Sequence, residues 1–146
     1  MGKLEILERF GKRVGYAPSE LARFQEDDPR VRHMERLAKA AERYSIVAEV
    51  IESRHCNAGH RPGQKLVMDI DGNFINKLCP SRMCIYLVSQ LAIPVALINE
   101  RLSEGLEPNR FHFMSRVHCT DSGVEACGYG QVMARISAWP REEVAA

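Results

Sequence analysis

The sequence predicts an α+β fold, in which an N-terminal helical arm of about three helices lies beside a small, mostly antiparallel sheet with a helical crossover. Three observations support this prediction. Apolar side chains recur at helical spacing in residues 1–45, β-branched side chains dominate residues 46–51, and side chains alternate in polarity over residues 131–138. Helices, strands, a helical segment and further strands in this order are typical of an α+β domain.

Each helix of the arm has its own signal. Leu4, Leu7 and Phe10 are spaced by three residues and predict a first short helix. Ser19 is a candidate cap for a second helix. The Asp-Asp-Pro sequence at 27–29 begins a third, because acidic residues stabilise the positive end of the helix dipole and proline suits the first turn. The mixed charges of this third helix indicate a solvated face.

The later elements are marked mainly by turns and prolines. A second strand is predicted over 65–70, and the Asp71-Gly72 pair that follows is a hairpin signal. Pro80 suits the first turn of a helix that Pro94 then breaks or kinks. Alternating side chains predict a strand over 111–118. We therefore expect a helical arm over 1–45, a Cys/His-containing α+β domain over 46–139 and a tail over 140–146.

Length and composition limit the classes of function. The chain has 146 residues, 45% of them hydrophobic and 27% charged, with a net charge of +1. These values are typical of one globular domain and give no general attraction to nucleic acid or to anionic membranes. No apolar run reaches the roughly 18 residues that span a bilayer, and the N-terminus does not resemble a signal peptide. We expect a cytoplasmic protein with reduced thiols, where cysteine clusters indicate metal or catalytic sites more often than disulfides.

All five cysteines lie between residues 56 and 127, in four groups near predicted turns. We interpret these groups as converging on one site for a metal or an iron–sulfur cluster, because thiolates and imidazoles held by turns are suitable ligands. Cys-Pro pairs recur in iron–sulfur sites, whereas the Cys-x-x-Cys pair of zinc fingers is missing. The candidate metal ligands are Cys56, His60, Cys79, Cys84, Cys119 and Cys127, of which Cys56, Cys79, Cys119 and Cys127 are the candidate cofactor-binding thiols. The cofactor is an iron–sulfur cluster or zinc.

Other interpretations of the same residues stay open. Cys84 is a ligand or a core residue, since cysteine often behaves as a small buried hydrophobe. His60 and Asp121 are candidate catalytic residues, with a nearby thiol as nucleophile. Asp121 is more simply a turn residue that binds its own backbone. We expect His33 and His112 to be solvated. His55 and His118 are ligands themselves, hydrogen-bond partners of ligands, or solvated side chains.

Residues 46–137 resemble a small family of functionally uncharacterised prokaryotic proteins. The family pattern is Cys-x-x-Gly-His, then Cys-Pro, then Cys-x-Asp before a final strand. The matching residues here are Cys56, Gly59 and His60, then Cys79 and Pro80, then Cys119 and Asp121. The resemblance implies one clustered site and implies no particular reaction.

The sequence therefore supports three hypotheses of function. The first is a metal- or iron–sulfur-cluster-binding small subunit or accessory protein of a larger enzyme system. The second is a stand-alone enzyme that uses metal-assisted or thiol chemistry of Cys and His. The third is a structural protein-interaction module. We expect a protein partner or a homo-oligomer, no nucleic acid and no membrane.

Overall fold

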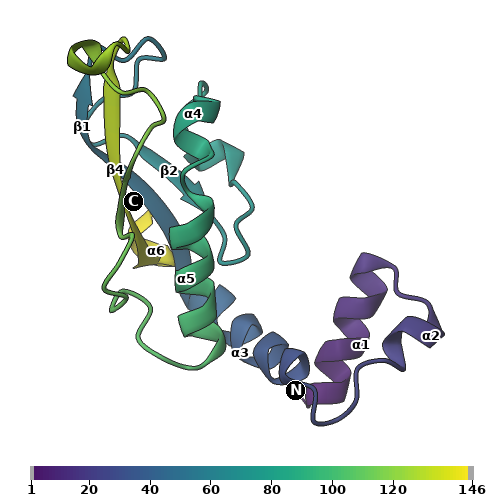
Figure 1. Cartoon of the computed structure of the whole chain (residues 1–146). Helices are drawn as coiled ribbons and strands as arrows, with labels where there is room; N and C mark the ends of the chain where they lie inside the picture. Colours follow the sequence, from purple (N-terminus) through teal and green to yellow (C-terminus); the bar gives the residue numbers. More distant parts are fainter. Residues whose placement is uncertain (1, 145–146) are drawn as a thin grey trace.

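The computed structural model describes residues 2–144 and has an α+β fold, as predicted (Figure 1). Within this range the chain forms six helices and a four-stranded antiparallel sheet. The helices are α1 (Lys3–Val14), α2 (Pro18–Leu21), α3 (Pro29–Arg43), α4 (Ile85–Val88), α5 (Ala92–Ser103) and α6 (Arg141–Val144). The strands are β1 (Tyr44–Arg54), β2 (Lys65–Met68), β3 (Arg116–His118) and β4 (Gln131–Pro140), and short 3₁₀ turns lie at Asn76–Leu78 and Val124–Ala126.

The sheet is built around one long antiparallel pair. Its strand order is β2-β1-β4-β3, so the first and last strands of the chain occupy the centre. β1 and β4 pair from Tyr44 opposite Pro140 to Arg54 opposite Gln131, with a bulge between Val50 and Glu52. The chain end of β1 and the start of β4 therefore lie together at one end of the sheet.

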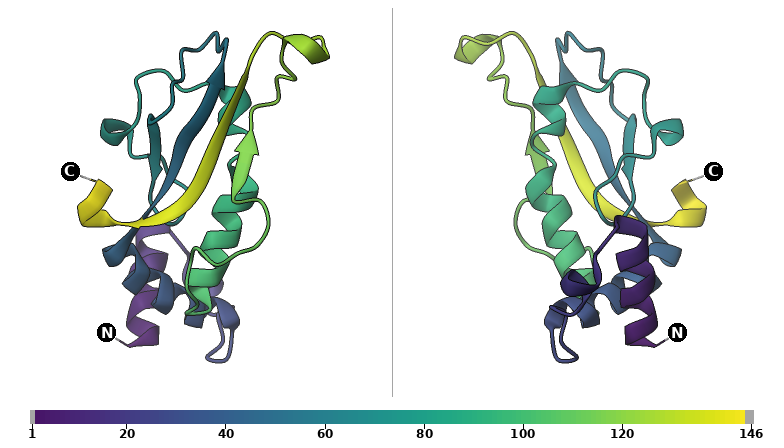
Figure 2. Two further views of the ribbon diagram at one scale, coloured as in Figure 1. Left: turned by 90° about the vertical axis from the view of Figure 1, so that its left-hand side faces the viewer. Right: turned by 90° about the vertical axis from the view of Figure 1, so that its right-hand side faces the viewer.

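The main core lies between one face of this sheet and helices α4 and α5 (Figure 2). Alternate residues of β1 and β4 supply the sheet side, because successive side chains of a strand point to opposite faces. Leu87 of α4 and Leu91, Ile98 and Leu102 around α5 supply the helical side. The residues with the lowest exposure in this cluster include Ile46, Ala48, Leu66, Leu87, Ile98, Ala134 and Ile136.

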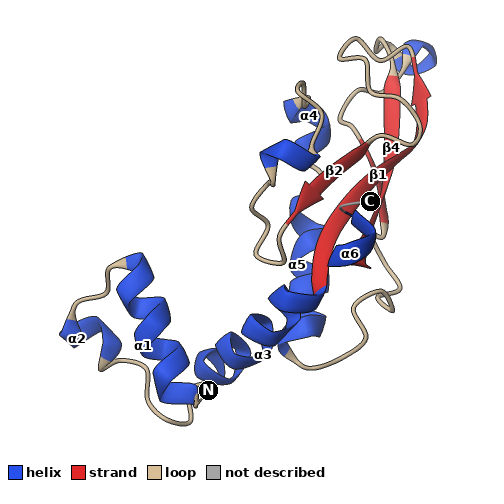
Figure 3. Ribbon diagram, turned by 180° about the vertical axis from the view of Figure 1, so that it is seen from behind, coloured by secondary structure: helices blue, strands red, loops and turns tan. Residues whose placement is uncertain are grey.

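The N-terminal arm consists of helices and loops only, and it projects from the strands (Figure 3). Pro29 begins α3 and the carboxylate of Asp28 accepts the backbone N–H of Arg30 at 2.9 Å, as the acidic signal predicted. Ser19 was expected to cap α2, but it lies inside that helix. The Glu20 carboxylate instead accepts the N–H of Ala17 at 2.9 Å.

A charged contact joins α3 to the end of α5. His33 was predicted to be solvated, but its Nε2 lies 2.7 Å from a carboxylate oxygen of Glu104 and its side chain is only partly exposed. Arg32 and Arg36 also lie within 3.5 Å of this carboxylate. The hydrogen bond from His33, followed by the charge of the arginines, lowers the pKa of Glu104. The charged face of α3 is thus partly a contact between helices.

The structure differs from the sequence prediction around the prolines. The helix expected from Pro80 begins only at Ile85, after Cys84. The break expected near Pro94 is present, since α4 ends at Val88 and α5 begins at Ala92. Pro94 lies in the first turn of α5, where its missing N–H leaves no intrahelical bond unmade. The strand expected over 111–118 is reduced to Arg116–His118, because Met114 has a positive φ of 67° that an extended strand does not adopt.

Two further expectations concern turns and the tail. The Asp71-Gly72 signal does mark a turn after β2: the Asp69 carboxylate accepts the N–H groups of Asp71 and Asn73, and Gly72 has a φ of 87°. The returning segment forms an isolated bridge between Met68 and Phe74, and the Ile75 N–H donates to the Val67 carbonyl at 2.9 Å. Helix α6 lies within the predicted tail, whose residues 145–146 lie outside the described range. Across residues 2–144, none of the helices combines the length and the apolar character needed to span a bilayer.

Because Ile136 is buried and Ile93 is exposed, replacing each with alanine is expected to change the stability of the protein by different amounts. Ile136 of β4 is 1% exposed in the main core, whereas Ile93 of α5 is 57% exposed. Replacing Ile136 with alanine leaves a cavity, so Ile136→Ala is expected to lower the free energy of unfolding by about 2–5 kcal/mol. Ile93→Ala is the matched control and is expected to change it by no more than about 0.5 kcal/mol. Urea unfolding followed by circular dichroism measures both, and equal effects would contradict the assigned packing.

Candidate functional site

The end of the sheet where β1 stops and β4 starts gathers most of the predicted site residues (Figure 1). Cys56 follows β1, Cys119 follows β3, and Cys127 precedes β4. The N-terminus of α4 is joined to this end by two hydrogen bonds, from the Cys84 N–H to His60 Nε2 at 3.1 Å and from the Thr120 N–H to the Tyr86 carbonyl at 3.2 Å. Antiparallel pairing thus brings segments far apart in sequence to one place.

His60 is a buried link between two segments, with only 2% of its surface exposed. Its Nε2 accepts the backbone N–H of Cys84, which can only donate, so Nε2 carries no proton in this arrangement. Nδ1 then carries the proton and donates a hydrogen bond to Gln64 Oε1 at 2.7 Å. Both ring nitrogens therefore have protein partners, and one of them must be released before His60 can bind a metal.

Cys79 is held at the outer edge of the sheet. Its thiol donates to the carbonyl oxygen of Val67 and accepts the N–H of the same residue, both at 3.2 Å. Val67 lies in β2, the edge strand of the sheet, and its carbonyl also accepts the N–H of Ile75 from the returning segment at 2.9 Å. The thiol thus accepts the outward Val67 N–H and helps to cover the edge of β2, at a distance along the sheet from the turns that carry Cys56 and Cys119.

Three thiols face the main core. Cys119 is buried, its N–H donates to the Val132 carbonyl at 2.9 Å, and its Sγ accepts the Val132 N–H at 3.3 Å. Cys56 and Cys84 are half-buried and pack against the same apolar cluster. Cys84 therefore has the packing that the core interpretation requires, while its role as a ligand stays a prediction.

Asp121 organises the loop between β3 and β4. Its carboxylate accepts the backbone N–H groups of Tyr129 at 2.9 Å, Gly123 at 3.1 Å and Gly130 at 3.0 Å. These bonds, led by the one from Tyr129, lower the pKa of Asp121 because they stabilise its charged form. A Cβ at Gly128 would clash with this carboxylate. The bonds match the turn-residue interpretation of Asp121 and leave its catalytic role without support from the geometry.

The remaining candidates lie on the surface of this end. Cys127 is exposed and has a φ of 67°, a left-handed conformation that ends the 3₁₀ turn at Val124–Ala126. His55 and His118 are exposed, and Nδ1 of His118 lies 3.2 Å from the Cys119 carbonyl. His112 is exposed, as expected. A Cβ at Gly130 would clash with the His55 carbonyl, so this glycine permits the close approach of the two turns.

The six predicted ligands have separate surroundings in this structure. Within residues 2–144, no group of three or more His, Cys, Asp or Glu side chains is arranged to hold a metal ion. The physical reason lies in their other contacts, since His60 and Cys79 bond to protein groups, Cys119 points into the core, and Cys127 lies on the exposed loop. The six residues as placed do not form one shell, and metal or cluster binding stays a prediction.

Exposed apolar side chains at this end were missed by the sequence analysis. Ile85 and Tyr86 begin the short helix α4, and Val124 and Tyr129 lie in the Asp121 loop. Tyr129 is 83% exposed, the largest value among the exposed large hydrophobic residues of the described range. The run Ile85–Val88 looks like core in the sequence, but a helix of only four residues buries one side and leaves its first two side chains outside.

Comparisons with protein-family models, with curated proteins and with solved structures find no match for this chain. The resemblance through Cys56, His60, Cys79 and Cys119 therefore stays a prediction. The function of this chain is therefore inferred from the geometry of this end of the sheet.

Removing the His60 side chain tests its role as a link. His60→Ala leaves the partly buried Cys84 N–H without its acceptor and opens a cavity at a buried position, so we expect a loss of about 2–4 kcal/mol in the free energy of unfolding. His112→Ala, at an exposed histidine, is the control and is expected to change stability by no more than about 0.5 kcal/mol. Thermal and urea unfolding measure both, and a His60→Ala protein as stable as the control would refute this role.

Replacing one oxygen of Asp121 tests its role in the loop. Asp121→Asn places an amide NH₂ where one carboxylate oxygen accepts an N–H, so we expect amide NMR signals of Tyr129 and Gly130 to show increased mobility. Because the folded pKa lies below the ordinary value of 3.8, the stabilisation is present above that value and is lost as pH falls through the lowered pKa. Glu125→Gln, in the same loop, is the control. Unchanged signals in Asp121→Asn would contradict the assigned bonds.

Proposed function

We propose that this protein is a small accessory module of a larger enzyme system, and that it binds a partner protein through the Cys/His end of its sheet. The observation that supports the proposal is a contrast at this end. His60 and Asp121 use their polar atoms inside the molecule, whereas Ile85, Tyr86 and Tyr129 are exposed. Exposed apolar side chains that gather over neighbouring elements are typical of interaction surfaces.

The charges around these side chains indicate the chemistry of the partner. Four exposed arginines flank the segments of this end, against two exposed acids: Arg54, Arg61, Arg82 and Arg116 against Glu52 and Glu125. Complementary charge favours a partner with an apolar centre and an acidic rim. Two copies of this chain would oppose their arginines across such an interface. Aliphatic side chains such as Ile85 and Val124 favour a protein surface over nucleic acid, which stacks on aromatic rings.

A metal or an iron–sulfur cluster is a second candidate, supported by a separate observation. Cys56, Cys84 and Cys119 all pack against the same core cluster, and coordination by all three thiols would require a rearrangement of the present structure. Cluster binding would require His60 or Cys79 to exchange its present partner if either is to serve as a fourth ligand. The stand-alone enzyme has less support, because both catalytic candidates are held by structural hydrogen bonds.

Partner binding is tested by reconstitution with matched variants. The full chain is cross-linked in an extract of the source cells, the captured protein is identified by mass spectrometry, and the complex is rebuilt from purified components. We expect a complex that weakens with salt and whose Kd rises at least about tenfold in the Tyr86→Glu/Tyr129→Glu variant. Leu4→Glu, at a 66% exposed position of α1, is the control and is expected to bind like the wild type.

Three outcomes would contradict this function. The double variant could bind like the wild type, the captured complex could dissolve with nuclease, or no protein could form a complex with the full chain. Elemental analysis of anaerobically purified protein tests the second candidate independently. Stoichiometric iron with acid-labile sulfide, or stoichiometric zinc, would support it, and a folded protein without any of them would refute it.

A further inference from the structure

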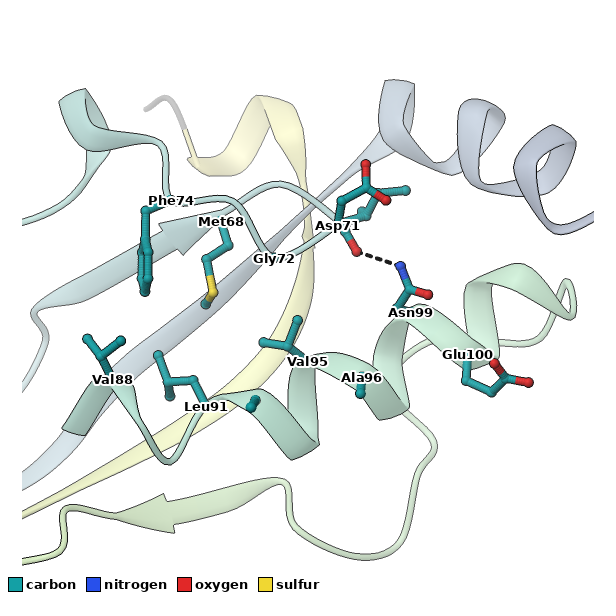
Figure 4. Close-up of a pocket in the computed structure, with 12 residues that line it drawn as sticks. Met68, Asp71, Gly72, Phe74, Val88, Leu91, Val95, Ala96, Asn99 and Glu100 are labelled. Carbon is teal, nitrogen blue, oxygen red and sulfur yellow. Dashed lines mark hydrogen bonds between the residues drawn. The ribbon is translucent and has the colours of Figure 1, made fainter. Parts of the chain in front are cut away.

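A slot of about 620 Å³ lies away from the Cys/His end, between the turn after β2 and helices α4 and α5 (Figure 4). Its size is within the range of small-molecule sites, which is about 300–1,000 Å³. The turn and α5 are joined at one point by the Asn99 side chain, whose Nδ2 donates to the Ile70 carbonyl at 2.8 Å. The slot extends from this bond toward α4.

One part of the slot is lined by apolar side chains. Phe74 and Met68 lie opposite Val88, Leu91 and Val95 across the opening (Figure 4). Met68 and Leu91 belong to the buried core, whereas Phe74, Val88 and Val95 are only partly buried. An apolar group in the slot would therefore cover side chains that the fold leaves partly in water, which is favourable.

The other part of the slot is acidic. Asp71 and Glu100 lie beyond the apolar side chains on either side of Asn99, and no Lys, Arg or His lines the slot. Burial, and then the charge of Asp69, raise the pKa of Asp71, and Arg13 on α1 opposes this effect. Glu100 is exposed, so its carboxylate can move toward a bound group without leaving water.

We propose that this slot binds a small organic amine, with the apolar body against Phe74 and Val95 and the protonated nitrogen beside Asn99, where the carboxylates of Asp71 and Glu100 can approach it. The combination of an apolar wall with two carboxylates and no basic residue selects among ligands of similar shape. A carboxylic acid would meet like charges, and a neutral alcohol would gain only the apolar contact. The site is independent of the surface proposed for the partner protein, because it shares no residue with it.

The probes are 2-phenylethylamine, 2-phenylethanol and 3-phenylpropionate, which carry similar aromatic bodies with different head groups. Each is titrated into the full-length protein and followed by amide NMR shifts of the turn after β2 and of α5. We expect the amine to bind about 2- to 5-fold more tightly than the alcohol, because exposed ion pairs contribute modestly, and the acid to bind more weakly than both. Raising the salt concentration is expected to reduce the difference.

Two variants separate the apolar contact from the charge. Asp71→Asn/Glu100→Gln is expected to bind the amine and the alcohol equally well, whereas Glu125→Gln, far from the slot, is the control. Ala96→Trp places a large ring at an exposed lining position and is expected to block all three probes. The proposal is overturned if the acid binds as well as the amine, if shifts arise elsewhere, or if no probe binds at millimolar concentration.

Discussion

The pairing of β1 with β4 is the constraint on which the rest of this structure depends. It runs over the full length of both strands, and one face of the pair provides the sheet side of the main core. Helix α3 continues directly into β1, so the pair also fixes where the arm leaves the sheet. A shift of one residue in this register would turn every buried side chain of the strand toward the opposite face, and the buried residues therefore specify the register strongly.

The same pairing explains why the cysteine-bearing turns meet, and their hydrogen bonds explain how they are held. Polar side chains in this region complete backbone hydrogen bonding where regular structure ends: Cys79 at the edge of β2, His60 at the start of α4, and Asp121 in the loop before β4. Each compensates for a segment that is too short or too irregular to satisfy its own N–H groups. The side chains of His60, Cys79 and Cys119, which the sequence suggests as metal ligands, thus form hydrogen bonds with other groups of the protein in this structure.

The sequence predicted the fold class, β1, β4, the start of α3 and the turn role of Asp121, because each depends on local patterns. It also indicated that the Cys and His segments lie near turns. It could not show that Met114 ends the expected strand, that α4 starts only after Cys84, or that His33 contacts Glu104. These features depend on contacts between residues far apart in the chain, as does the exposure of Ile85 and Tyr86. The partners of His60 were equally invisible, since Gln64 and the Cys84 N–H carry no sequence signal of their own.

His60 links the two candidate functions of the Cys/His end through one hydrogen bond. Its Nε2 accepts the N–H of Cys84, and Cys84 directly precedes the exposed residues Ile85 and Tyr86. A metal at Nε2 would displace this N–H and free the start of α4, since a ring nitrogen cannot serve both partners. The exposed side chains would then lose a fixed position. If His60 bound a metal through Nε2, that binding would compete with partner binding through α4, because both would depend on the same hydrogen bond.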